Sequence, residues 1–253
     1  TTRWDAVRAA KIRLLEVRGA LPDEVTDSET GVTFAPEKGT VPKRSHYACS
    51  ACGTVQDILV TVKAIGKTAP MAAYAAQCYS PKRDAGGKPY GGRFFAAIAG
   101  ALAKQYDTAA DEWNERKDGD LRDYWPRSAI PIGAEIGPHD VEGHRFTHWW
   151  TMFNPRQLLV HASLMKAIVN VGNYDWKVRE YVLGAFQNFL RNQNLFAFWH
   201  MKLDKLAPAM SNSNFHPKNN VVEVGVFPPM GYGPWSSTVE VLFKTESDRK
   251  SVV

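Results

Sequence analysis

Apolar residues recur at helical spacing in three stretches of the chain. The first stretch, residues 4–17, is followed by Gly19 and Pro22, which stop a helix. The third runs from Pro155 to Gly172 and continues over residues 176–210 as one long or two consecutive helices. The buried face predicted for residues 176–210 consists of Val178, Val182, Ala185, Phe186 and Phe189. The second stretch begins at residue 94 and, over about five turns, places on one face Phe95, Ile98, Leu102, Tyr106, Ala109 and Trp113.

A different pattern, with short runs of β-type residues, occupies the region from Val25 to Ile65. Gly, Pro and Lys residues separate the runs, which read GVTF, HYAC and VQDILVTVKAI. Together the two patterns predict an α+β protein. Its expected parts are an N-terminal helix (1–24), a small β module (25–80), a Gly/Lys-rich connector (81–93), a mainly α-helical domain (94–215) and a short β and turn segment (216–247).

Composition and charge narrow the class of protein. A hydrophobic content of 44% over 253 residues is typical of a globular chain with a sizeable core. The net charge of +5 suits an anionic partner but falls well short of a polybasic chain. No stretch approaches the roughly 20 apolar residues of a membrane span, so no membrane partner is expected.

Both ends of the sequence predict an incomplete chain. The first residues lack an initiator Met and an apolar signal core, so we expect the chain to begin within a longer protein. The last six residues, DRKSVV, match the translation of a common sequencing-adapter string. We therefore expect residues 248–253 to be a sequencing artefact.

Three cysteines are present, and two of them form a C-x-x-C within YACSACGTV. An odd number cannot pair completely, so the composition favours a reducing, cytoplasmic setting over a secreted disulfide framework. Cys49 and Cys52, around a tight turn with Gly53, have the form of a zinc knuckle. Tetrahedral zinc needs four ligands, and the nearby donors His46 and Cys78 do not form a second knuckle. We interpret the motif as half of a zinc site, with a simple turn carrying two thiols as the alternative.

The stretch HRFTHWWTMFNPRQLLVHASL, residues 144–164, leads from an aromatic cluster into an apolar helix. Asn154 is a good N-cap, and Pro155 suits the first helical position, where its missing N–H costs nothing. Arg156 and Gln157 then lie in the first turn, beside free backbone N–H groups and the positive end of the helix dipole. Because an arginine is unfavourable there unless an anion or a carboxylate answers it, its position indicates a partner.

Four interpretations compete for this stretch. A structural role would pack Trp149, Trp150, Met152 and Phe153 as core. A metal site would need His139, His144, His148 and His161, whose spacing fits no standard ligand pattern. A hydrolase would need Ser128, Thr147 or Ser163 as nucleophile, but the sequence has no G-x-S-x-G. Nucleic-acid contact, through phosphate binding and base stacking, would use Arg145, His148, Trp149, Arg156 and Gln157. The structural and nucleic-acid interpretations both stay open.

A family resemblance rests on three segments in order: HYACSACGTV, DYWPRSAIPIG and FTHWWTMFNPRQLLVHASLMKAI. Followed by a long helix and FPPMGYGPW, they resemble the middle of the large adenine-specific DNA methylases that contain an internal zinc ribbon, several of which sit in anti-phage defence loci. FNPRQLL is the most specific element, and the resemblance covers about residues 25–240. It implies a zinc-ribbon-like β module followed by a helical domain, inserted in a Rossmann-like methyltransferase.

The resemblance also implies which parts lie elsewhere. Enzymes of this family bind S-adenosylmethionine with a Phe-x-Gly-x-Gly loop and hold the target adenine with an Asp/Asn-Pro-Pro-Tyr/Phe element. Neither occurs in this sequence, where the only Pro-Pro, Pro228–Pro229, follows Phe227. The chain is thus expected to be an internal, non-catalytic part of the enzyme, used for DNA binding, target recognition or scaffolding.

Carried over by position, the resemblance makes Cys49 and Cys52 zinc ligands and Arg156 and Gln157 the polar pair of the family motif. The other zinc ligands and the cofactor loop would lie in the remaining domains of the parent enzyme. Its expected partners are therefore DNA and those domains. The alternative is a free-standing zinc-ribbon helical module that mediates nucleic-acid or protein interaction; an unrelated hydrolase is a third hypothesis.

Overall fold

The structure, a computed structural model of the chain, divides into two compact units. The first comprises Trp4–Ala103 and Gly143–Arg145; the second comprises Lys104–Glu142 and Phe146–Val253, with Thr1–Arg3. The residues that the structure describes are 14, 15, 17, 20, 22–38, 46–48, 52–66, 71, 73–83, 92–98, 100–131, 143–171, 175–200, 205–208, 221–226 and 234–250.

The first unit contains three separate two-stranded antiparallel sheets among its described residues. Residues of the predicted runs GVTF and HYAC form strands within them, so this part of the β prediction is confirmed. The pairs are β1 (Val25–Thr26) with β2 (Thr33–Phe34), β3 (His46–Ala48) with β4 (Val55–Asp57), and β5 (Ala76–Tyr79) with β6 (Arg93–Ala96).

The run ILVTVKAI, predicted to be β, forms the helix α2 (Ile58–Ile65) instead. Both ends of α2 are capped. The Asp57 side chain accepts a hydrogen bond from the Val60 N–H at 2.9 Å, and Gly66 ends the helix in the left-handed conformation, with φ 72°. Since β-branched residues lose only a few tenths of a kcal/mol in a helix relative to leucine, the two caps outweigh that preference.

The helix predicted from residue 94 begins later, at Ala101. Phe95, assigned to its apolar face, lies in β6 opposite Gln77 and is 51% exposed. Gly100, with a φ of 55°, separates the strand from the helix α3 (Ala101–Arg116). From Tyr106 on, the prediction holds, since Tyr106 and Trp113 are buried.

The N-terminal helix predicted for residues 4–17 falls mostly outside the described residues. Leu14, Leu15 and Val17, which are described, lie in no helix.

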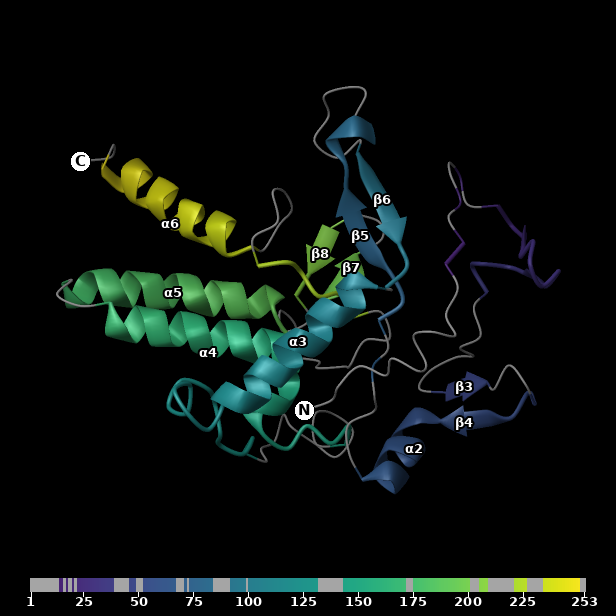
Figure 1. Cartoon of the computed structure of the whole chain (residues 1–253), viewed down its shortest axis with the longest axis horizontal. Helices are drawn as coiled ribbons and strands as arrows, with labels where there is room; N and C mark the ends of the chain where they lie inside the picture. The colour runs from purple at the N-terminus through teal and green to yellow at the C-terminus, as the bar shows by residue number, and fades with distance from the viewer. Residues whose placement is uncertain are drawn as a thin grey trace. The chain divides into compact units, whose positions relative to one another are not determined.

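The second unit is built from helices that pack around α4 (Pro155–Asn170). Figure 1 shows α4 and α5 (Trp176–Asn192) side by side, with α6 (Trp235–Lys250) along α5. One buried cluster joins Leu158 and Ala162 of α4 to Trp113 of α3 and to Leu121. A second cluster joins Ile168 of α4 to Phe186 and Phe189 of α5. With the small sheets, these helices make the described fold α+β, as the sequence predicted.

The chain leaves α5 earlier than predicted. Asn194 closes the helix: its amide donates to the carbonyls of Leu190 and Arg191, and its Oδ1 accepts the Phe196 N–H. Two segments beyond it that were expected to be helical form the antiparallel strands β7 (Phe198–His200) and β8 (Lys205–Ala207). Of the buried face predicted for α5, Ala185, Phe186 and Phe189 are buried, Val182 packs against the core, and Val178 is exposed.

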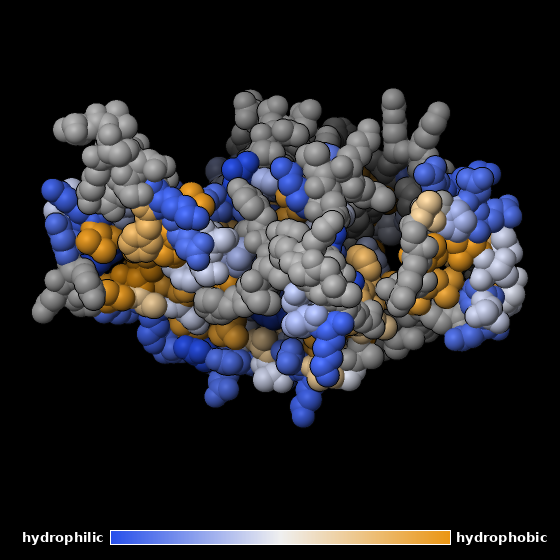
Figure 2. All heavy atoms as spheres, turned by 90° about the horizontal axis from the view of Figure 1, so that it is seen from above, coloured by the Kyte–Doolittle hydropathy of each residue, from blue (hydrophilic) through white to orange (hydrophobic). Residues whose placement is uncertain are grey.

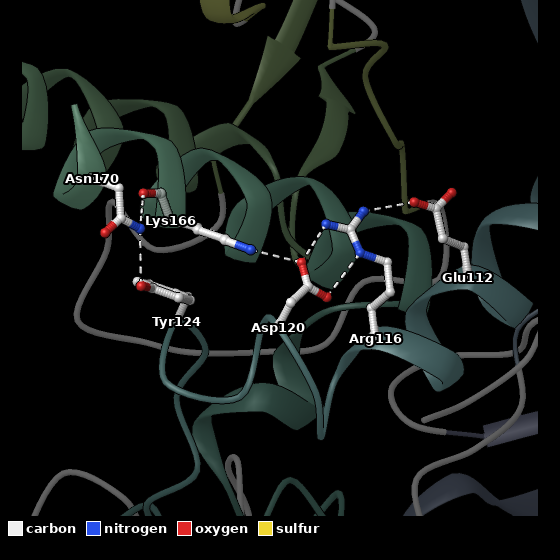
Figure 3. A network of polar contacts seen from close by, with 6 residues as sticks. All are labelled: Glu112, Arg116, Asp120, Tyr124, Lys166 and Asn170. Atoms are coloured by element: carbon white, nitrogen blue, oxygen red, sulfur yellow. Dashed lines mark hydrogen bonds and ion pairs between the residues drawn. The ribbon is translucent and has the colours of Figure 1, made fainter. Parts of the chain in front are cut away.

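Charged side chains tie α3 and the turn after it to α4 (Figure 3). Asp120 accepts hydrogen bonds from Arg116 and, at 2.8 Å, from Lys166 of α4. Arg116 also bonds Glu112, and the Asn170 amide donates to the Tyr124 hydroxyl. The hydrogen bond from Arg116 holds the pKa of Asp120 well below its usual range. Because all four charged groups are solvated, the network orients α4 more than it stabilises it.

Apolar side chains also reach the surface of the second unit. Figure 2 shows apolar residues, in orange, at the surface of the part formed by α5 and α6. The exposed apolar side chains of these two helices include Val178 at 48%, Val241 at 53% and Phe243 at 68% exposure. None of the described helices is both long and apolar enough to cross a lipid bilayer.

Candidate functional site

The candidate site lies at the start of α4, which is built as its sequence predicts. Asn154 is extended, with φ −82° and ψ 168°, and its side chain accepts the Gln157 N–H at 2.9 Å. The Gln157 Oε1 in turn accepts the Asn154 N–H at 3.0 Å. Pro155 occupies the first turn. This reciprocal capping box fixes where the helix begins and how the side chain of the next residue, Arg156, leaves it.

The carboxylate of Glu223 pairs with the Arg156 guanidinium. Its Oε1 accepts from the Arg156 Nε at 2.7 Å, and its Oε2 accepts from the Asn154 Nδ2 at 2.7 Å. The Glu223 segment is held in place because the Val222 N–H donates to the Ala197 carbonyl at 2.9 Å. One side chain thus bridges the N-cap and the first turn of α4.

The environment of Arg156 keeps it charged. Burial disfavours the guanidinium, but the attraction of Glu223 and its hydrogen bond outweigh that, so the pKa of Arg156 lies above its ordinary value. Its Cζ also lies 5.5 Å from the centre of the Tyr106 ring. The side chain is 41% exposed, and among the described residues only its Nε makes a hydrogen bond. The two terminal nitrogens are thus available to an outside acceptor.

A pocket of about 180 Å³ lies beside this pair. Its apolar walls come from Val160 of α4 and from the segment 224–226. Its polar lining consists of Arg156, Gln157, His161, Gln193 and Glu223.

His161 and Gln193 carry buried polar atoms that no described residue satisfies. The residues are 5% and 2% exposed, and neither the His161 Nδ1 nor the Gln193 Nε2 has a hydrogen-bond partner in the described part of the chain. Three phenylalanine rings surround the imidazole edge-on, at 4.9 Å (Phe153), 5.8 Å (Phe189) and 6.2 Å (Phe186). Burial lowers the pKa of His161 to about 3, so the ring is neutral near pH 7.

The other residues predicted to contact nucleic acid do not line this pocket. Trp149 is 37% exposed in the short 3-10 helix η2 (Trp149–Met152), and the His148 Nδ1 lies 3.0 Å from the Thr147 hydroxyl. Arg145 has a φ of 64° in the turn Gly143–Arg145, which belongs to the first unit. The structure therefore brings together Arg156 and Gln157 of the predicted set, and adds Glu223, His161 and Gln193.

Only one of the two predicted zinc ligands, Cys52, lies among the described residues. Cys49 lies outside the described residues, whereas Cys52 is exposed just before β4, with its thiol 3.2 Å from the Thr54 hydroxyl. The adjacent Gly53 has a φ of 71°, the conformation expected of a knuckle turn. Among the described residues, no three His, Cys, Asp or Glu side chains lie close enough together to hold a metal ion.

Sequence reasoning missed Glu223 and Gln193, although a signal for the former existed. Glu223 interrupts the apolar run VVEVGVF, and a lone carboxylate in such a run indicates a buried partner. Gln193 follows the last turn of α5 with no local pattern that marks it. Comparison with known proteins adds nothing to this site, since no family model, curated protein or solved structure matches the chain.

Proposed function

We propose that the chain is a non-catalytic, DNA-binding or scaffolding part of an S-adenosylmethionine-dependent, adenine-specific DNA methyltransferase. The observation that carries the proposal is the FNPRQLL element, whose capping box and Glu223 bond hold the Arg156 guanidinium in one orientation with both terminal nitrogens uncommitted. Planar guanidinium donors suit phosphate oxygens. Held by the carboxylate, Arg156 would contact a DNA phosphate and set the register of the parent enzyme on the duplex.

The roles of the remaining groups follow from the same proposal. S-adenosylmethionine would be bound by the parent enzyme outside this chain, because the sequence lacks the cofactor loop. The turn carrying Cys52 and Gly53 fits half of a zinc ribbon, so Cys49 and Cys52 would supply two thiolates and other segments the remaining ligands. Such a zinc ion would hold the β module together and take no part in methyl transfer.

A salt titration tests the DNA contact. We expect Arg156→Ala to weaken binding of duplexes of unrelated sequence to the same extent, and to flatten the dependence of log K on log salt concentration by about 0.9. Arg156→Lys should restore most of that slope because it keeps the charge. The matched control is Lys166→Ala. Lys166 lies on α4, like Arg156, but its charge is already paired with Asp120. Fluorescence anisotropy between about 50 and 200 mM salt measures all four proteins.

Unchanged binding by Arg156→Ala, together with a lower melting temperature, would mean that Arg156 only braces the loop. Equal losses in Arg156→Ala and Lys166→Ala would indicate a general charge effect without a contact at the motif. The enzyme assignment has its own test, the genomic sequence beyond both ends of the chain. A Phe-x-Gly-x-Gly loop upstream and an Asp-Pro-Pro-Tyr-like element downstream support it, whereas native start and stop codons at these ends refute it.

A further inference from the structure

We propose that Tyr106 of α3 is a positioning residue for Arg156, whose ring holds the guanidinium so that its two terminal nitrogens are ready to meet a DNA phosphate. This role rests on the proposed function, because it takes the phosphate contact of Arg156 as its starting point. It adds the side chain, on another helix, that prepares Arg156 for that contact.

The Tyr106 ring has a firm position in the core. Tyr106, Ala110 and Trp113 recur at the spacing of a single helix face, and all three are buried, at 7%, 1% and 1% exposure. Trp113 belongs to the buried cluster that includes Leu158 and Ala162 of α4. This cluster packs α3 against α4. Tyr106, about two turns before Trp113 on the same face, is thereby held beside the first turn of α4.

The ring lies where it attracts the Arg156 cation. The Arg156 Cζ is 5.5 Å from the centre of the Tyr106 ring, within the roughly 6 Å over which the negative face of an aromatic ring attracts a guanidinium. An aromatic face neutralises no charge, so Arg156 keeps its positive charge for an anion. The Arg156 side chain is 41% exposed, which leaves part of it open to such an anion.

The hydrogen bond to Glu223 does not fix the guanidinium by itself. Among the described residues Arg156 makes one hydrogen bond, from its Nε to the Glu223 Oε1 at 2.7 Å. A single bond leaves the guanidinium plane free to turn about the line between donor and acceptor. The Glu223 carboxylate also competes with a phosphate for the same cation, whereas the Tyr106 ring does not. The ring is therefore the contact that can persist when Arg156 binds a phosphate.

Removing the ring should weaken DNA binding without changing its dependence on salt. Immobilising a long side chain at an interface lowers affinity by about 2–10-fold, and a side chain that is already held avoids that loss. Tyr106→Leu, which keeps an apolar side chain but removes the ring, should therefore bind duplex DNA about 2–10-fold more weakly than the wild type. The slope of log K against log salt concentration should stay the same, because the charge of Arg156 remains. Tyr106→Phe keeps the ring and should bind as the wild type does.

Phe186→Leu is the matched control. It removes a ring of similar burial, at 5% exposure, from the cluster around Ile168. It should lower the melting temperature and leave the affinity for DNA unchanged. Relaxation of the Arg156 Nε–H group, measured by nuclear magnetic resonance without DNA, reports the immobilisation directly. That group should be rigid in the wild type and in Tyr106→Phe, and more mobile in Tyr106→Leu.

Double variants separate this role from the DNA contact itself. With Arg156→Ala in place, Tyr106→Leu should cause no further loss of affinity. A loss of equal size in both backgrounds would mean that Tyr106 only supports the fold, and would overturn the inference. Unchanged affinity in Tyr106→Leu, while Arg156→Ala weakens binding, would overturn it and leave the proposed function standing. If Arg156→Ala binds DNA as the wild type does, the phosphate contact and the role of Tyr106 fail together.

A second replacement covers the case in which Tyr106→Leu does not fold. A ring-fluorinated phenylalanine at position 106 keeps the shape of the ring but withdraws charge from its face. DNA binding should then be weaker than in Tyr106→Phe. Equal binding by these two proteins would refute an attraction between the ring and Arg156.

Discussion

Lowering the pH from about 7.5 to about 4.5 should destabilise the unit that contains α4, because the buried imidazole of His161 resists protonation. Its pKa in the folded chain is about 3, against an ordinary value of 6.5. Below pH 6.5 the unfolded chain takes up a proton that the folded chain refuses, so acid favours unfolding. The stability in question is complete above pH 6.5 and is lost progressively as the pH falls from about 6.5 to about 3.

The magnitude follows from the size of the shift. Each pKa unit corresponds to about 1.4 kcal/mol, so the loss over the whole window approaches about 5 kcal/mol. At pH 4.5 the expected loss is about 2.5–3 kcal/mol, which corresponds to a fall in melting temperature of roughly 5–11 °C for a protein of this length. No charged partner enters this figure, because burial alone shifts the pKa.

Thermal unfolding of the wild type and of His161→Phe at several pH values measures the effect. The variant fills the same space among Phe153, Phe186 and Phe189 and cannot titrate, so its stability should depend less on pH between 6.5 and 4.5. Both proteins share the other six histidines and the carboxylates, so the difference between their curves isolates His161. Asp120, whose pKa is lowered, contributes stability that is lost only as the pH falls below its unfolded value of about 3.8. Parallel curves for the two proteins would refute the buried, neutral imidazole.

Two further substitutions test the construction of the site. Asn154→Ala removes the N-cap and the contact with Glu223, and should lower the free energy of unfolding by about 1–2 kcal/mol in a urea titration. Asn154→Ser keeps a capping side chain and should recover more than half of that loss. Equal losses in Asn154→Ala and Asn154→Ser would show that the cap contributes nothing. Glu223→Gln keeps the shape of the side chain but removes the counter-charge of Arg156, so the free energy of unfolding should fall by about 1 kcal/mol, given the partial exposure of Arg156. The affinity for DNA should rise, because the guanidinium no longer has a competing carboxylate. The gain in affinity should vanish in the double variant with Arg156→Ala, and a gain that persists there would contradict a contact through Arg156.

The start of α4 was predictable because its signals are local. Asn154, Pro155 and Gln157 lie within four consecutive positions, and each acts on backbone groups of its own turn. The run at 58–65 was misassigned for the opposite reason: its β-branched residues outweighed, in our reading, the caps Asp57 and Gly66 at its two ends. Phe95 was misassigned because its strand conformation depends on pairing with the strand that contains Gln77, and helical periodicity does not reveal that pairing.

The contents of the site were beyond local reasoning. That Arg156 needs an anion follows from its place in a first turn, but the answering carboxylate lies 67 residues away, in a segment held by the backbone of Ala197. The sequence offered His161 as one of four histidines for a metal site, whereas in the structure phenylalanine rings surround its imidazole. Such distant pairings depend on how the helices pack, and the spacing of residues in the sequence does not reveal them.

The unpaired atoms of His161 and Gln193 are informative because the surrounding polar groups are satisfied. Asn154 and Glu223 each engage both ends of their side chains, and Asn194, beside Gln193, makes three hydrogen bonds with the backbone. A core that satisfies these groups gains nothing by keeping an imidazole and an amide unpaired, since apolar residues of the same shape remove a cost of roughly 1–3 kcal/mol each. Both residues line one pocket, but the Trp113 Nε1, which is also buried without a partner among the described residues, lies in the core away from it, so an unpaired buried atom does not by itself mark a binding site.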